Sequence, residues 1–256
     1  MKYALVTGGS RGIGRAICVK LFQMGYEVLI NYVSNDAAAK ETLDMIEGHG
    51  ELMRFDVSDP GAVKAALEGW QAAHPEEYIE VLVNNAGVYH DKDILEDSEA
   101  FTHLIMNLHM VTPAMLCYLF GQDMKARGKG YILNVCSVTS KMAAQRLGTY
   151  GGTKAFLSHF TRALHIELKP YGVYVTDVSP GAVDTGLYSI SPALTRLGKC
   201  LGIIVSPQTL VRRALRALFH GRSKTTIPTV FWQVLSFIIL LIPTWMLRLI
   251  RRLGWF

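Results

Sequence analysis

The segment "TGGSRGIG", residues 7–14, follows an apolar run at residues 3–6 and leads into a helix-length amphipathic segment. Ile13, Ile17 and Leu21 recur every four residues, so they share one face of that helix. Glycines allow positive φ angles and the close approach of a ligand, while the N-terminus of a helix offers unpaired N–H groups. Between a strand and a helix, this loop predicts a binding site for the pyrophosphate of a dinucleotide.

Apolar, β-branched runs alternate with amphipathic segments along most of the chain, which is typical of a parallel sheet covered on both faces. Strands are expected at residues 3–6, 27–32, 52–56, 80–83, 131–136 and 173–178, with a seventh at 225–227. Later helices are expected at residues 36–47, 61–73, 101–126, 150–169 and 207–220. We therefore predict one α/β domain at residues 1–226, a Rossmann-type doubly wound parallel sheet of about seven strands, and an apolar C-terminal segment at 227–256.

Charge is divided unevenly along the chain. Residues 185–256 contain ten Lys and Arg and no Asp or Glu, so residues 1–184 hold the other 16 of the 26 basic side chains and all 21 acidic ones. The chain is thus an acidic body of net charge −5 followed by a basic last quarter of +10. Because that quarter is also rich in Leu, Ile, Trp and Phe and lacks a recognised nucleic-acid module, an anionic membrane surface explains it better than a nucleic acid does.

The cysteines and histidines do not indicate a metal site. None of the four cysteines has C-x-x-C spacing or a nearby histidine pair, so neither a disulfide framework nor a zinc site is predicted, and a reducing, cytoplasmic setting is expected. The N-terminal segment leaves no room for a signal-peptide core. Cys136 is expected to be a buried thiol. Surface or packing roles are expected for His103, His109, His159 and His165.

Further motifs follow the glycine loop at the ends of the predicted strands. They are Asp56, "NNAG" at 84–87, Asn107 within "IMNLHM", Ser137, "YGGTK" at 150–154 and "SPGAVDT" at 179–185. With the TGxxxGxG spacing of the glycine loop, this ordered set resembles the short-chain dehydrogenase/reductase family over residues 3–228. The resemblance implies an oxidoreductase that transfers hydride between a nicotinamide cofactor and a carbonyl or alcohol group.

The resemblance also implies four catalytic residues. Tyr150 is the acid, Ser137 positions the carbonyl oxygen, Lys154 bonds the nicotinamide ribose, and Asn107 holds a water of the proton relay. A free tyrosine has a pKa of about 10, and a nearby ammonium lowers it by favouring the phenolate. Tyr150 and Lys154 are four residues apart in a predicted helix, so they share a face.

NADP is the predicted cofactor. In "NYVSND", Asn31, Tyr32 and Val33 are uncharged where NAD enzymes of this type usually carry an acid, and Arg11 supplies a basic residue for a 2′-phosphate. Asp36 lies close enough to keep NAD open. The cofactor contacts implied by the resemblance are Gly8, Ser10, Arg11, Gly12, Ile13, Gly14, Asn31, Ser34, Asp56, Val57, Asn85, Ala86, Gly87, Tyr150, Lys154, Pro180, Gly181, Val183 and Thr185.

The C-terminal segment has the composition of a membrane element. Residues 225–247 are 23 positions without a charge, but Pro228 and Pro243 leave an uninterrupted stretch of only 14. This length favours an interfacial helix over a full span, with tryptophans at the headgroup level and arginines facing phosphates. A buried dimer or core element is the main alternative, and a true span is a second.

The region before this segment predicts the substrate class. Residues 186–205 lie where the family carries a mobile lid, and here they are apolar and basic, while the helix at 207–220 is amphipathic and basic. We expect NADPH-dependent reduction of a lipidic ketone, 3-ketosphinganine or a long-chain 3-oxoacyl substrate, on the cytoplasmic side of a membrane. The alternatives are a soluble 3-oxoacyl carrier-protein reductase, a steroid-type dehydrogenase, and a non-catalytic NADP(H) sensor. A homodimer or homotetramer is common in the family.

Overall fold

The computed structural model describes residues 1–142, 145–186 and 191–225, with isolated positions at 234, 237, 238, 242 and 246. The predicted C-terminal segment at 227–256 therefore lies outside the described residues except at those positions. The expected strand at 225–227 is found as the two-residue strand β9, Lys224–Thr225.

Seven strands form one parallel sheet in the order β3-β2-β1-β4-β5-β6-β9. The first six are β1 Lys2–Val6, β2 Glu27–Tyr32, β3 Gly50–Arg54, β4 Tyr78–Asn84, β5 Gly130–Val135 and β6 Val173–Val178. The predicted doubly wound fold is thereby confirmed. The order reverses between β1 and β4, and ligands of such sheets bind beyond the carboxyl ends of the strands at this point.

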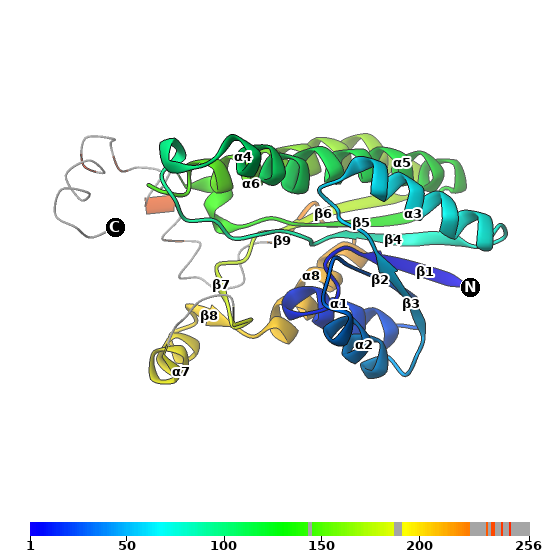
Figure 1. Ribbon diagram of the computed structural model, residues 1–256, viewed down its shortest axis with the longest axis horizontal. Coiled ribbons are helices and arrows are strands. Elements are labelled where there is room, and N and C mark those ends of the chain that lie inside the picture. Colours follow the sequence, from blue (N-terminus) through cyan, green and yellow to red (C-terminus); the bar gives the residue numbers. More distant parts are fainter. Residues whose placement is uncertain are drawn as a thin grey trace.

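Helices cover both faces of the sheet (Figure 1). On one face lie α1 Gly12–Phe22, α2 Asp36–Met45 and α8 Pro207–Phe219. On the other lie α3 Pro60–Ala73, α4 Glu99–Met106, α5 Thr112–Arg127 and α6 Gly148–Leu168. Successive side chains of a strand point to opposite faces. Accordingly Ala4 and Val6 join the apolar core beneath α1 and α8, while Tyr3 and Leu5 join the second core beneath α3, α5 and α6.

The helix predicted at residues 101–126 is interrupted. A π-helical segment, Asn107–Val111, separates α4 from α5, and it begins at the predicted catalytic asparagine. Such π segments occur frequently at functional sites. In the part of the chain that the structure describes, residues 99–127 form the one helical stretch long and apolar enough to cross a membrane. Leu116 and Met124 of this stretch are buried in the core against the sheet, as expected of a core helix.

A small additional unit lies at the end of the sheet opposite the N-terminus (Figure 1). Strand β7, Ala182–Val183, pairs in parallel with β8, Ile204–Val205, and α7, Pro192–Cys200, connects them. This unit occupies the region expected to be a substrate lid. Residues 187–190, between β7 and α7, lie outside the described residues.

The predicted start of α8 is confirmed. The Ser206 side chain accepts a hydrogen bond from the backbone N–H of Thr209, and Pro207 is the first helical residue. Leu210 and Leu215 of this helix are buried against α1 and the sheet, while Arg212 and Arg216 are exposed. The basic side chains of α8 therefore face outward from a helix that the apolar core holds in place.

Candidate active site

The glycine loop closes tightly on the start of α1. Gly8 has φ of +63° and Gly12 has φ of +57°, a region that side chains other than glycine rarely adopt. A Cβ on Gly14 would lie 2.1 Å from the backbone oxygen of Gly8, so only glycine allows this approach of helix and loop. Arg11 precedes the helix and is exposed, and no acidic residue occurs in the first turn. The free N–H groups of this turn can therefore meet an anion without repulsion.

The loop after β4 is bonded directly to the glycine loop. Thr7 Oγ1 accepts hydrogen bonds from the backbone N–H groups of Asn85 and Ala86, at 2.9 and 3.0 Å. The Asn85 side-chain amide donates to the backbone oxygens of Thr7 and Gly8, at 2.9 and 3.1 Å. The "TGG" and "NNAG" segments consequently form one rigid unit at the carboxyl ends of β1 and β4.

Asn31 has a different role from the one predicted for it. Its side chain is 1% exposed, accepts from the Gly8 N–H at 3.1 Å and donates to the backbone oxygens of Met53 and Phe55. Because these bonds use the amide inside the protein, the side chain supports the glycine loop from below and is not exposed to a cofactor. An asparagine at the end of a strand gives no sequence signal that distinguishes the two roles.

Arg15 is a supporting residue that sequence reasoning missed. Its guanidinium donates to the backbone oxygen of Ser10 at 2.8 Å and to that of Ala38 at 3.1 Å, and forms a 2.7 Å ion pair with Glu41. It thereby ties the glycine loop to α2 through Ser10. The residue lies one position after Gly14 on the buried side of α1, and only the three-dimensional arrangement shows what it contacts.

A group of polar and basic side chains surrounds the end of β2. Ser34 and Val33 are exposed there, and Arg54, a residue not predicted for the site, donates from Nε to the Val33 oxygen at 3.2 Å. Arg54 also lies 3.5 Å from Asp36, the acid that kept NAD open. A cation beside Asp36 offsets its repulsion of a nearby phosphate, so this corner fits a 2′-phosphate better than the sequence alone indicated.

The side chains of Asp56 and Asn107 are both hydrogen-bonded to Ser58. Asp56 is exposed after β3, and its carboxylate accepts from the backbone N–H and hydroxyl of Ser58, both at 2.8 Å. The side-chain amide of Asn107 donates to the Ser58 oxygen at 3.3 Å, and Thr112 Oγ1 donates to the Val57 oxygen at 2.7 Å. The segment predicted to contact the cofactor through Asp56 and Val57 is therefore connected to the π-helical segment that carries Asn107.

Ser137, Tyr150 and Lys154 belong to two adjacent elements. Ser137 follows β5, is 8% exposed, and its Oγ accepts from the Thr139 N–H at 3.2 Å. Tyr150 and Lys154 lie on α6, with the Lys154 Nζ 6.0 Å from the centre of the Tyr150 ring. Lys154 is 5% exposed and donates to the Val135 oxygen at 3.0 Å. Burial lowers the pKa of Lys154 from its ordinary value.

Cys136 precedes Ser137 and is buried, as expected. Burial raises the pKa of this thiol far above its ordinary value, with a further contribution from Asp177. The thiol is therefore not ionised near neutral pH.

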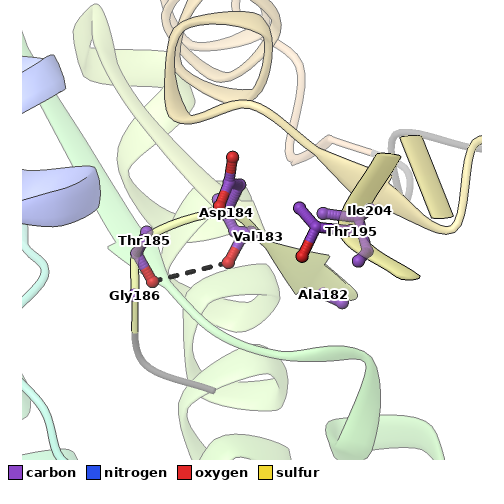
Figure 2. Close-up of a pocket in the computed structure, with 7 residues that line it drawn as sticks. All are labelled: Ala182, Val183, Asp184, Thr185, Gly186, Thr195 and Ile204. Carbon is purple, nitrogen blue, oxygen red and sulfur yellow. Dashed lines mark hydrogen bonds between the residues drawn. The ribbon is translucent and has the colours of Figure 1, made fainter. Parts of the chain in front are cut away.

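The "SPGAVDT" segment closes the other side of the site. The Pro180 oxygen accepts from the Val138 N–H at 2.9 Å, which ties the segment to the turn that holds Ser137. Thr185 lies against the glycine loop, since a Cβ on Gly12 would be 3.5 Å from its Cβ. Thr185 also lines a pocket in which Thr195 and Ile204 face Val183 (Figure 2). Lys199 pairs with Asp184 at 2.5 Å, so α7 is linked to this segment by charge.

These observations meet the requirements of a dinucleotide. The positive-φ glycines and the acid-free start of α1 suit a pyrophosphate, and Ser34 with the exposed Arg11 and Arg54 suits a 2′-phosphate. Ser179, 0% exposed at the end of β6, has a hydroxyl without a hydrogen-bond partner among the described residues.

Comparison with known proteins gives a consistent result. Residues 2–192 match the short chain dehydrogenase family. The chain is 31% identical over 188 residues to the 3-oxoacyl-[acyl-carrier-protein] reductase FabG of Vibrio cholerae, covering 73% of this chain and 75% of that protein. It is 36% identical over 199 residues to FabG of Pseudomonas aeruginosa, covering 76% and 79%. A metagenomic short-chain oxidoreductase solved with NADP superposes with a TM-score of 0.72 at 26% identity, covering 90% of this chain and 98% of that one.

Proposed function

Because this chain belongs to the short-chain dehydrogenase family, we propose that it is an NADP-dependent oxidoreductase that reduces the keto group of a 3-oxoacyl thioester to the 3-hydroxyacyl product. The observation that carries the proposal is the position of Lys154, whose Nζ lies 6.0 Å from the centre of the Tyr150 ring and would be 3.6 Å from a Cβ on Gly87, in the loop that is bonded to the glycine loop. The 3-oxoacyl carrier-protein reductases among the relatives support this reading over the sphingolipid substrate expected from the sequence.

The proposed roles follow from charge development in the reaction. Reduction of a ketone places negative charge on its oxygen, which must be stabilised and protonated. The nicotinamide of bound NADPH supplies the hydride. The Ser137 hydroxyl orients the carbonyl oxygen and Tyr150 donates the proton. The ammonium of Lys154, held by the Val135 oxygen at 3.0 Å, favours the phenolate that Tyr150 becomes. Asn107, at the start of the π-helical segment, would hold the water through which the proton is replaced.

A long-chain substrate remains part of the proposal. The region from residue 193 onward lies beyond the family match, and it contains the basic α8 and the uncharged segment at 225–247. Leu197 and Leu201, in and just after α7, are 55% and 60% exposed next to the pocket region. We therefore propose that residues 227–256 form a membrane-associating segment, distinct from the catalytic domain at 1–226, and that the acyl chain is a long one. The same features make 3-ketosphinganine the second candidate substrate.

Substrate comparison tests the proposal. NADPH oxidation by the purified full chain in detergent would be measured with a long-chain 3-oxoacyl thioester, 3-ketosphinganine and a short water-soluble 3-ketoester. The highest kcat/KM on the thioester supports the proposal. Preference for 3-ketosphinganine would replace it with the lipid-ketone reading. Undetectable oxidation with all three, in a protein that binds NADPH, would favour the non-catalytic NADP(H) sensor.

A further inference from the structure

His109 lies in the π-helical segment and is 1% exposed. The backbone N–H of Val88 donates to its Nε2 at 3.1 Å, and its Nδ1 lies 3.1 Å from Thr153 Oγ1. The Thr153 hydroxyl in turn donates to the backbone oxygen of Tyr150 at 2.8 Å. A backbone N–H can only donate, so Nε2 must be the unprotonated nitrogen of the ring. The proton of the neutral ring is consequently on Nδ1, and it points to Thr153.

The chain of donors therefore has one direction. The Val88 N–H donates to His109 Nε2, His109 Nδ1 donates to the Thr153 hydroxyl, and that hydroxyl donates to the backbone oxygen of Tyr150. A proton on Nε2 would face the Val88 N–H and leave both donors unpaired in a buried place. Burial, with the nearby Lys154, lowers the pKa of His109 to about 2, so the ring stays neutral at ordinary pH.

His109 also limits where the reacting side chains can lie. Its ring meets the Tyr150 ring edge-on, with centres 5.7 Å apart. A Cβ on Gly87 would be 2.9 Å from His109 Nε2 and 3.6 Å from Lys154 Nζ, so the loop after β4 packs directly against both. Three elements thus meet at this imidazole: the loop that is bonded to the glycine loop, the π-helical segment, and the start of α6.

We propose that His109 is a positioning residue for the reaction. Its neutral ring fixes the start of α6, which carries Tyr150, relative to the loop at 84–88. The proposal rests on the proposed oxidoreductase function, because the loop at 84–88 is expected to contact the cofactor and Tyr150 to protonate the reacting carbonyl. Displacement of a proton donor by about 1 Å can lower the rate about a hundredfold, so loss of the His109 contacts should lower kcat.

Two substitutions at His109 separate hydrogen bonding from packing. His109→Phe retains a planar ring beside Tyr150 but removes both hydrogen bonds. We expect kcat to fall about 10- to 100-fold, while the KM values for NADPH and for the thioester stay within about threefold of the wild type. His109→Gln retains one acceptor and one donor on a planar amide, and we expect it to recover most of the lost kcat. The assay uses full-length protein, NADPH and a 3-oxoacyl thioester, far below the unfolding temperature of each variant.

His165→Phe is the matched control. His165 is also buried on α6, 6% exposed, and its Nδ1 lies 2.9 Å from the Val175 oxygen, but it is near the far end of the helix. We expect this variant to lose stability without losing kcat. Equal kcat in His109→Phe and His165→Phe would overturn the proposal. If His109→Phe does not fold, Thr153→Val with Thr153→Ser as its rescue carries the same comparison, because Thr153 is the next link in the chain.

NMR provides a readout that does not depend on turnover. In protein with ¹⁵N-labelled histidine, we expect His109 to carry its proton on Nδ1 and to remain neutral from about pH 5 to 9. In protein with labelled tyrosine, the ring resonance of Tyr150 should shift in His109→Phe, return in His109→Gln and stay in place in His165→Phe. A wild type inactive on 3-oxoacyl thioesters would refute the proposed function alone. A proton on Nε2, or an unmoved Tyr150 resonance, would refute the role of His109.

Discussion

At the residue scale, Tyr150, the proposed proton donor, lies close to the side chains of Lys154, Tyr89 and His109. Lys154 is buried with its charge directed at the Val135 oxygen, and Tyr150 lies between the aromatic rings of Tyr89 and His109. A charged amine in a buried place stabilises a nearby anion more strongly than it would in water. This environment would stabilise the phenolate that the proposed proton transfer leaves on Tyr150.

Removal of the Tyr150 hydroxyl is expected to abolish most of the activity. In Tyr150→Phe the ring contacts remain but the proton donor is lost, so kcat should fall about 10²- to 10⁴-fold, the usual contribution of a general acid. Stopped-flow NADPH oxidation measures the rate, and NADPH titration by fluorescence serves as the control for binding. Retention of more than a tenth of the wild-type kcat would assign the proton to another group.

Cofactor preference should depend on Arg11, which precedes α1, and Arg54, the last residue of β3. Arg11 is exposed at the start of α1, and Arg54 lies 3.5 Å from Asp36 and bonds the Val33 oxygen. For Arg11→Ala and Arg54→Ala we expect the KM for NADPH to rise about tenfold each, since a charge-assisted bond to phosphate contributes about 1.5–3 kcal/mol. The KM for NADH, which lacks the phosphate, should change little. Parallel loss of both affinities would place these arginines on the pyrophosphate.

The sequence predicted which residues reach the site better than what each of them does there. Motif spacing placed Ser137 after a strand and Tyr150 with Lys154 on one helix, and the structure has them after β5 and on α6. Asn31 was predicted to contact the cofactor, but its amide is used inside the protein. The bonds of His109 and Arg15 depend on partners 21 to 44 and 5 to 27 positions away, and no local pattern reveals such partners.

At the element scale, periodicity located the strands and most helices because both faces of the sheet are buried. It missed the π-helical segment at 107–111, since one wider turn leaves the apolar pattern almost unchanged, and it missed α7 within the expected lid. The amino ends of the central strands, away from the site, carry a different polar cluster. The buried carboxylate of Glu80 accepts from the hydroxyls of Tyr26 and Tyr78, at 2.9 and 3.2 Å, and pairs with Lys129 at 3.2 Å.

This cluster predicts a loss of stability at alkaline pH. Burial and the Glu80 carboxylate raise the pKa of Tyr26 above its ordinary value. Because the pKa of Tyr26 is higher in the folded protein than in the unfolded chain, where it is about 10, this tyrosine stabilises the fold fully below about pH 10. The stabilisation is lost as the pH rises above about 10 toward the folded-state pKa. We expect the free energy of unfolding, measured by urea titration, to fall above about pH 10. The decrease of this free energy with pH should be less steep in Tyr26→Phe than in the wild type. At pH 7 that variant should lose about 1 kcal/mol with its hydrogen bond. An unchanged slope would assign the alkaline effect to other groups.

At the scale of the whole molecule, the chain combines an acidic catalytic body with a basic, apolar end. The family match stops at residue 192. Residues 185–256 contain ten basic side chains and no acidic one. Within the described part of this region, Arg212 and Arg216 project from α8, whose apolar side is buried. The basic side chains are thus held on a rigid support, and their charge is available to an anionic surface.

The membrane proposal predicts salt-sensitive binding to anionic vesicles that requires the C-terminal segment. We expect the full chain to sediment with vesicles containing about 30% phosphatidylserine, to bind neutral vesicles more weakly, and to be partly released at about 0.5 M salt, because exposed charges attract anionic lipid and salt screens them. A chain ending at residue 226 keeps β9 and should fold with the same circular dichroism but lose most of the binding. Arg212→Gln with Arg216→Gln should weaken only the salt-sensitive part. Full binding by the shortened chain would place the membrane contact on α7 and α8 instead, and equal absence of binding in both chains would assign the apolar segment to packing within an oligomer.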